Sequence, residues 1–310
     1  MITTVTLNAS VDKAYVMEKE IVGGTVMRVQ KCRNSAGGKG LNVSRVIDLC
    51  GADVKATGLA GGYNGSYLEK LLEEDGIRNE FCHIAGETRS CINILDPKFS
   101  STEFLEPGCE VTGEELDTFF ARFPEIIADS SVVTLSGSIP KGVPTDVYAK
   151  LVSIARENGK QVLLDTSGEP LTRGMEAVPT LVKPNKDELE DLFSVKVRSI
   201  EDVLACAEKL ADTGIEYVVV SMGGDGALML CKDGVFRAVS PDVDVVNTVG
   251  CGDSMIGGFA VAFERGLSPA DALRYASSVA TANALSPNTG DFDPAVQNEL
   301  YERTAVQKLA

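Results

Sequence analysis

The sequence is short of histidine: the 310 residues include His83 and no other, and tryptophan is absent. Ser-His-Asp and Cys-His catalysis both need an imidazole to carry protons, so either would have to use His83. His83 follows Phe81-Cys82 in a strand-like run, which favours a structural position. The eight cysteines form no Cys-x-x-Cys pair, so the ligand spacing of a zinc site is also missing. If the protein uses a general base, we expect a carboxylate.

Basic residues are scarce as well: 29 Lys and Arg against 45 Asp and Glu give a formal charge of −16. Nucleic acids and anionic membranes bind basic surfaces, so we expect neither as a partner. No apolar run approaches the roughly 20 residues that cross a bilayer. The sequence opens on Met1-Ile2-Thr3 without a signal-peptide pattern, and we therefore expect reduced cysteines and a cytoplasmic location.

Strand-like and helix-like segments alternate along most of the chain. Strands are expected at 1–7, 54–59, 131–135, 161–165 and 217–221, and helical patterns at 64–75, 147–157, 186–193 and 200–212 lie between the later ones. This alternation predicts an α/β protein with a mostly parallel sheet covered on both faces. No repeat or low-complexity linker marks a boundary, so we expect a single domain over residues 1–310. Two β-rich excursions, at about 13–34 and 89–104, predict a small additional sheet that acts as a lid or a pairing surface.

The most informative stretch is Val246–Phe259. The alternation of Val243 and Val245 predicts a strand before it, and Met255 and Phe259 recur at helical spacing. Between them, Gly250-Cys251-Gly252 allows a tight turn whose amides, with the helix dipole, favour an anion.

Asp253 follows this turn directly. A carboxylate beside an anion site can accept a proton from a hydroxyl while the amides stabilise a transferring phosphoryl group. The alternative is a structural turn with Asp253 as the helix cap.

Two other glycine-rich turns, Gly37-Gly38-Lys39-Gly40 and Gly223-Gly224-Asp225-Gly226, also follow β-like runs and should lie at the same rim of the sheet. Neither a Walker A loop nor a complete dinucleotide fingerprint is present. Lys39 is the strongest candidate for a phosphate-binding cation, the alternative being a solvated turn lysine.

A polar pair, Asn185 and Glu188, opens another predicted helix. The spacing is that of a helix capping box. The same pair could instead order water around Mg²⁺ bound to ATP phosphates.

Four segments together resemble the ribokinase-like carbohydrate kinases of the PfkB family over essentially the whole chain. They are Ala36–Arg45, Lys183-Pro184-Asn185-x-x-Glu188, Ser221–Gly226 and Asn247–Asp253. Within this family the sequence is most similar to the phosphosugar branch, 1-phosphofructokinase and tagatose-6-phosphate kinase. The features that carry this second likeness are Asn8–Asp12, Gly86–Arg89 and Ser136–Pro140.

The resemblance implies a three-layer αβα sandwich with a mostly parallel central sheet and a small β-sheet lid, which often also forms the dimer contact. It implies Asp253 as the catalytic base and Gly250, Cys251 and Gly252 as the anion hole. The residues implied for the sugar are Asp12, Gly37, Gly38, Asn42 and Ser138, with Lys39 and Arg89 on the phosphate that the sugar already carries. Those implied for ATP are Lys183, Asn185, Ser221, Gly223, Gly226 and Asn283, with Glu188 and Asn185 holding Mg²⁺ through water.

The expected reaction is phosphoryl transfer from ATP, with Mg²⁺, to fructose 1-phosphate, which gives fructose 1,6-bisphosphate. Tagatose 6-phosphate is the alternative acceptor. A non-catalytic sugar-phosphate-binding protein and a nicotinamide-dependent oxidoreductase are weaker alternatives, because the base and the ATP loops are intact and the dinucleotide fingerprint is missing. One departure is Asn247, where many family members have Asp; the missing charge puts a monovalent-cation site in doubt.

Overall fold

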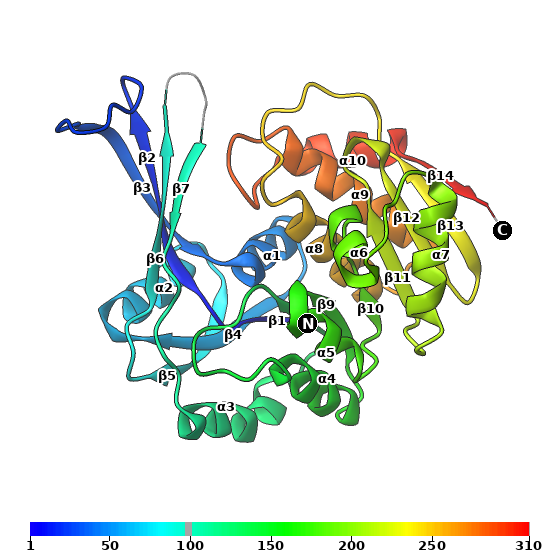
Figure 1. Cartoon of the computed structure of the whole chain (residues 1–310), viewed down its shortest axis with the longest axis horizontal. Coiled ribbons are helices and arrows are strands. Elements are labelled where there is room, and N and C mark those ends of the chain that lie inside the picture. The colour runs from blue at the N-terminus through cyan, green and yellow to red at the C-terminus, as the bar shows by residue number, and fades with distance from the viewer. Residues whose placement is uncertain (97–100, 310) are drawn as a thin grey trace.

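The computed structural model describes residues 1–96 and 101–309. Within these residues the strands form a ten-stranded main sheet and a separate four-stranded sheet (Figure 1). The strands of the main sheet, in spatial order, are β14 (Ala305–Lys308), β13 (Gly234–Val239), β12 (Ala227–Cys231), β11 (Tyr217–Ser221), β10 (Leu181–Val182), β9 (Gln161–Asp165), β8 (Val132–Ser136), β1 (Ile2–Thr6), β4 (Val54–Gly61) and β5 (Arg78–Ile84).

The main sheet is parallel from β11 to β5 and antiparallel from β11 to β14. Successive residues of a strand point to opposite faces. In β9, for example, Leu163 belongs to one apolar cluster and Leu164 to the other. The sheet therefore needs a helical layer on each side, as parallel sheets usually do.

Two sets of helices supply these layers. One face is covered by α1 (Lys39–Leu49), α2 (Gly62–Glu74), α8 (Cys251–Glu264), α9 (Pro269–Ala284) and α10 (Pro294–Arg303). The other is covered by α3 (Gly113–Ile126), α4 (Val147–Glu157), α5 (Gly168–Met175), α6 (Lys186–Phe193) and α7 (Ile200–Ala211). The expected three-layer sandwich is confirmed.

The second sheet consists of β3 (Val29–Gly37), β2 (Ser10–Met17), β6 (Arg89–Leu95) and β7 (Ser101–Leu105), in that order. It stands away from the β1 side of the main sheet in Figure 1, and we refer to it as the lid. Both predicted β excursions lie in it, although β2 begins at Ser10 and β3 continues to Gly37. The strand β3 thereby delivers the first glycine-rich turn directly to α1. The segment 97–100, inside the second excursion, lies outside the described residues.

The prediction of a strand before Gly250 is wrong. Residues 240–248 form no strand, and Val245 and Val246 are 56% and 61% exposed. The alternating valines find no strand to pair with, because the edge of β13 is occupied by β14. The backbone amides of Val246 and Asn247 instead donate to the carbonyl oxygen of Ala284.

None of the helices in the described part of the chain is both long and apolar enough to span a membrane.

Candidate active site

The turn before α8 is held in a conformation that suits glycine. Gly250 caps the helix with φ +82°, in the left-handed region, and a Cβ at this position would overlap Thr289. The amide of Ser254 donates to the Gly250 carbonyl at 2.8 Å and that of Cys251 to Thr248 at 3.3 Å. The amides of Gly252 and Asp253 have no acceptor within the described residues. Two free donors therefore point out of the positive end of α8.

Asp253 is the third residue of α8, and 6% of it is exposed. Its Oδ2 accepts a hydrogen bond of 2.7 Å from Nδ2 of Asn42, on α1. Burial, reinforced by the charge of Asp165, raises the pKa of Asp253 to about 6, against the opposing effects of Lys39, Asn42 and Lys183. A carboxylate with this pKa is ionised at neutral pH and is basic enough to accept a proton during catalysis. The helix-cap alternative does not hold, because Gly250 occupies the cap position.

Asp165 is a buried site residue that the sequence analysis did not identify. It ends β9, it is 4% exposed, and its Oδ1 lies 3.2 Å from Nζ of the buried Lys183. Its Oδ2 is buried without a hydrogen-bond partner among the described residues and lies 3.9 Å from Nζ of Lys39. The available signal was its position at the carboxyl end of a parallel strand, where α/β proteins bind ligands.

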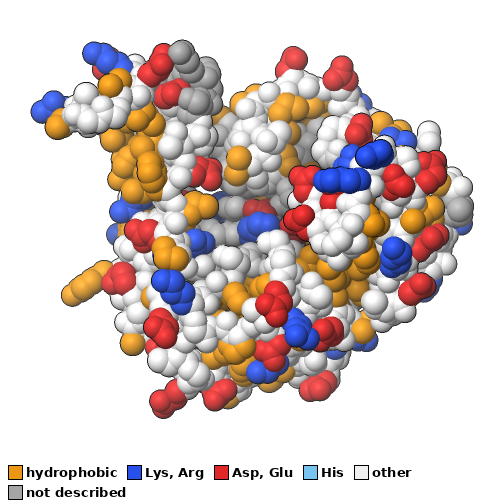
Figure 2. Space-filling view, in the orientation of Figure 1, with side chains coloured by type: hydrophobic (Ala, Val, Ile, Leu, Met, Phe, Trp, Pro, Cys, Tyr) orange, Lys and Arg blue, Asp and Glu red, His pale blue; other side chains and the backbone are white. Residues whose placement is uncertain are grey.

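The two lysines lie on the floor of the site. Nζ of Lys183 is 3.4 Å from the position that a Cβ on Gly252 would take, so this ammonium sits beside the free amides of α8. Lys39 is 45% exposed, and its pKa is raised mainly by Asp165, with further contributions from Asp253 and Glu188. Figure 2 shows the molecule hollowed between the lid and the main body, with charged side chains of both signs at the bottom.

The second and third motifs meet at one edge of this floor. Asn185 and Glu188 form a complete capping box at the start of α6, which confirms that interpretation of the pair. The backbone of Asn185 bridges to Ser221, at the end of β11. The following turn exposes Gly223, whereas Gly226 is buried with φ +88° against Ala238.

Asn283 braces the turn from behind. It is fully buried, its Nδ2 donates to the carbonyl oxygen of Val249 at 3.0 Å, and its Oδ1 accepts from the amide of Gly290 at 2.8 Å. Both ends of its carboxamide are therefore engaged inside the protein. The structure places Asn283 beneath the turn before α8 rather than on a surface that an adenine could reach.

The residues that the sequence analysis expects to bind the sugar lie where the lid meets the main body. Asp12 accepts from Ser10 at 2.6 Å, and its carboxylate packs so closely on Gly37 that a Cβ there would overlap it. Burial raises the pKa of Asp12, and the charges of Arg45 and Arg89 oppose that rise.

Arg89 is partly occupied in the structure. Its guanidinium donates to the carbonyl oxygens of Asn8 and Glu106, which leaves two of its five N–H groups without an acceptor among the described residues. Ser138 accepts a hydrogen bond of 3.2 Å from Asn8 Nδ2. Arg89 is thus placed near Asp12, whereas Lys39 is placed near Asp165.

Comparison with known proteins identifies the family of this chain. The family model described as "pfkB family carbohydrate kinase" matches residues 5–296. The chain belongs to the PfkB family of carbohydrate kinases. It is accordingly a phosphotransferase with an alcohol group as acceptor.

Solved structures of similar proteins include several phosphofructokinases. A candidate phosphofructokinase from Staphylococcus aureus is 31% identical with a TM-score of 0.87, and the match covers 100% of this chain and 99% of that one. Phosphofructokinase-2 from Escherichia coli, in complex with fructose 6-phosphate, is 27% identical with a TM-score of 0.89 and coverages of 97% and 98%. A candidate 1-phosphofructokinase from Thermotoga maritima is 27% identical with a TM-score of 0.84, and both chains are covered in full. A ribokinase from Arabidopsis thaliana, 20% identical with a TM-score of 0.77 over 97% of this chain and 98% of its own, shares the fold.

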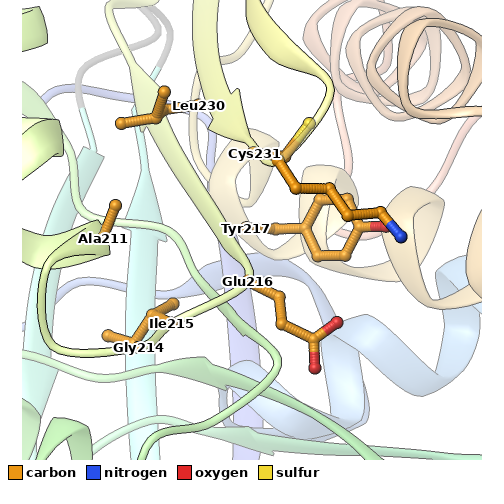
Figure 3. A pocket seen from close by; sticks show the side chains of 8 residues that line it. Ala211, Gly214, Ile215, Glu216, Tyr217, Leu230 and Cys231 are labelled. Atoms are coloured by element: carbon orange, nitrogen blue, oxygen red, sulfur yellow. The ribbon is translucent and has the colours of Figure 1, made fainter.

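The kinase has a further pocket at the opposite end of β11 (Figure 3). Its lining includes the apolar Ile215, Tyr217 and Leu230 and the charged Glu216 and Lys232. Tyr217 begins β11 whereas Ser221 ends it, so this pocket lies at the other rim of the sheet from the motifs described above.

Proposed function

We propose that this PfkB kinase transfers the γ-phosphoryl group of ATP to a hydroxyl of a ketohexose phosphate. Fructose 1-phosphate, which gives fructose 1,6-bisphosphate, is the acceptor that we favour. The observation that carries the proposal is the buried Asp253 beside two free amides and the Lys39–Asp165–Lys183 cluster. Phosphoryl transfer needs mainly positioning and charge neutralisation, and this arrangement provides both.

In the proposed mechanism Asp253 accepts the proton of the attacking hydroxyl. The amides of Gly252 and Asp253, with the ammonium of Lys183, stabilise the charge on the transferring phosphoryl group. Lys39 is directed towards Asp165 and Asp253. We therefore revise its role: it contacts the transferring group rather than the phosphate that the sugar carries. That second phosphate is then bound by Arg89, at the foot of the lid beside Asp12.

ATP and Mg²⁺ fit the residues around Asp165 and Glu188. The orphaned carboxylate oxygen of Asp165 and the carboxylate of Glu188 are the hard oxygen donors that Mg²⁺ prefers, directly or through water. Glu188 Oε2 and Asn185 Oδ1 already serve the helix cap, so we propose that the metal uses the remaining oxygens. Bound Mg²⁺ would neutralise the nucleotide phosphates. The exposed Gly223 leaves space for the nucleotide.

Arg89 lies beside Asp12, whereas Lys39 lies beside Asp165. The separation of these two cations supports a phosphorylated acceptor. One end of the sugar would be fixed by Arg89, and the hydroxyl at the other end would face Asp253. Fructose 1-phosphate and fructose 6-phosphate both fulfil this requirement and give the same bisphosphate. The likenesses to a candidate 1-phosphofructokinase and to a fructose-6-phosphate complex make both of them acceptors to test, together with tagatose 6-phosphate.

The deciding experiment measures ADP release with MgATP and a panel of these three phosphosugars and free fructose. We expect the highest kcat/KM for fructose 1-phosphate and at least a hundredfold lower value for free fructose. Arg89→Gln should remove most of this preference by raising KM for the phosphosugar. A higher kcat/KM for free fructose would refute the phosphosugar proposal.

We also propose a homodimer formed through the lid. Large apolar side chains are exposed on the lid strand β7, where Phe104 and Leu105 are 58% and 65% exposed, and in the segment between β2 and β3, where Val22 and Val26 are 55% and 91% exposed. Contiguous exposed apolar surface marks interaction sites, and we propose that these side chains contribute to one. Light scattering on the purified protein should give a dimer that Phe104→Glu converts to monomer; a wild-type monomer would refute it.

A further inference from the structure

Arg45 connects the two halves of the acceptor site through hydrogen bonds that local sequence patterns do not predict. It lies on α1, one turn after Asn42, as expected for side-chain neighbours three residues apart. Its Nη2 donates to Oδ1 of Asn42 at 2.6 Å, and its Nη1 donates to the carbonyl oxygen of Ala36 at 2.5 Å. Nδ2 of Asn42 in turn donates to Oδ2 of Asp253.

The donors and acceptors in this series of hydrogen bonds fix the orientation of the Asn42 carboxamide. Arginine carries donors and no acceptor, so the Asn42 atom that faces Arg45 has to be the oxygen. The NH₂ group must then face Asp253. A flipped carboxamide would place two acceptor oxygens against each other. Arg45 therefore selects the orientation in which Asn42 occupies Oδ2 of Asp253 and leaves Oδ1 for the substrate proton.

We propose that Arg45 is a positioning residue that orients the base Asp253 through Asn42. Its second bond, to Ala36, ties the same guanidinium to the chain immediately before the Gly37-Gly38 turn, against which Asp12 packs. The Arg45 side chain thus fixes the position of the base Asp253 relative to the Gly37-Gly38 turn. This inference rests on the proposed role of Asp253.

The other ionisable groups around Asp253 are accounted for by separate elements. Asp165 reaches it from β9, Lys183 from the end of β10, and Lys39 from the start of α1. The Cys251 thiol on α8 also senses its charge. None of these groups makes a hydrogen bond to Arg45 within the described residues, so replacing Arg45 removes its bonds to Asn42 and Ala36 and a cation that acts on both Asp253 and Asp12.

The test replaces Arg45 with Met. Without its donor, Asn42 is free to rotate, which weakens the hydrogen bond that favours ionised Asp253. The Arg45 cation, which interacts with the Asp253 charge, is lost as well. We expect kcat to fall at least tenfold, KM for ATP to stay within twofold, and the acid limb of the kcat profile to move to higher pH. Arg45→Lys keeps the charge but can serve only one of the two oxygens, and should give intermediate values.

The matched control is Arg265→Met. Arg265 also spans two acceptors, the hydroxyl of Tyr275 and the carbonyl oxygen of Cys50, but at the far end of α8 from the turn. It should cost stability without moving the pH profile. If Arg45→Met and Arg265→Met lower kcat equally and neither moves the acid limb, Arg45 is only a structural brace and the proposal is wrong.

A titration that needs no substrate separates this inference from the proposed function. Carbon-13 NMR of aspartate carboxyls, with Asp253→Asn for assignment, reports the pKa of Asp253 directly. A higher pKa in Arg45→Met supports the positioning role even if no phosphosugar is turned over, in which case only the proposed function fails. An unchanged pKa overturns it. If Arg45→Met does not fold, Arg45→Lys decides: wild-type kcat and an unchanged Asp253 pKa would refute the proposal.

Discussion

Replacing Asp253 with Asn should make the protein more stable while it abolishes activity. The carboxylate is buried, and its pKa lies at about 6 instead of the ordinary 3.8. This difference means that folding costs about 3 kcal/mol more with the charge than without it. Asparagine has nearly the same shape, and its oxygen can still accept the hydrogen bond from Asn42. Asp253→Asn should therefore keep the hydrogen bond from Asn42 and avoid the free-energy cost of burying a charge.

The raised pKa of Asp253 also predicts how the stability advantage of Asp253→Asn depends on pH. Because the native state holds the proton more tightly than the unfolded state, stability from this group falls as pH rises from about 4 to 6. Above that range both states are ionised and the full cost of about 3 kcal/mol applies. At pH 4.5 the advantage of Asp253→Asn should shrink to about 1 kcal/mol, and below the unfolded pKa it should vanish.

The assay is urea unfolding at pH 7.5 and 4.5, followed by far-ultraviolet circular dichroism because the chain has no tryptophan. Asp244→Asn, in an exposed loop, is the control and should change stability by less than about 0.5 kcal/mol. In parallel, kcat of Asp253→Asn should fall at least about a hundredfold with ATP binding retained. If Asp253→Asn is no more stable than the wild type at pH 7.5, the Asp253 carboxylate does not carry the proposed burial cost. Near-wild-type turnover would refute its role as the general base.

Three further predictions concern the rest of the site. The kcat/KM of the wild type should decline about tenfold per pH unit below about 6, because the base must be ionised; a flat profile down to pH 5 would contradict it. Gly37→Ala should raise KM for the phosphosugar at least tenfold with little change in KM for ATP, since its Cβ would displace the Asp12 carboxylate, and steady-state kinetics with each substrate varied will show whether that split occurs. Asn283→Ala should cost about 1–3 kcal/mol and lower kcat more than it raises KM for ATP, because it frees Val249 and Gly290 around the turn; Ser278→Ala, on the same helix but bonded to Tyr275 and Gln297, is the control, and an equal effect of the two on kcat would argue against a role for Asn283 in the turn.

Much of the framework could be predicted from local sequence patterns. The alternation of periodicities indicated the layered sheet, the capping box at Asn185 and Glu188 marked the start of α6, and the two β excursions marked the lid. These features follow from interactions between residues close in the chain, and such interactions leave a period or a spacing that can be seen in the sequence. The same patterns failed for the valines before Gly250, because a strand also needs a neighbour to pair with.

Tertiary structure alone decided which groups meet at the base. Asn42 and Asp253 are 211 residues apart in sequence, and Asp165 reaches both lysines from the end of a strand that appears unremarkable on its own. Whether a charge is buried, and which donor faces it, depends on surfaces brought together only when the layers close. The sequence by itself determined that Asp253 stands at the start of a helix, and the packing of α1 against α8 determined its partner, its burial and its pKa.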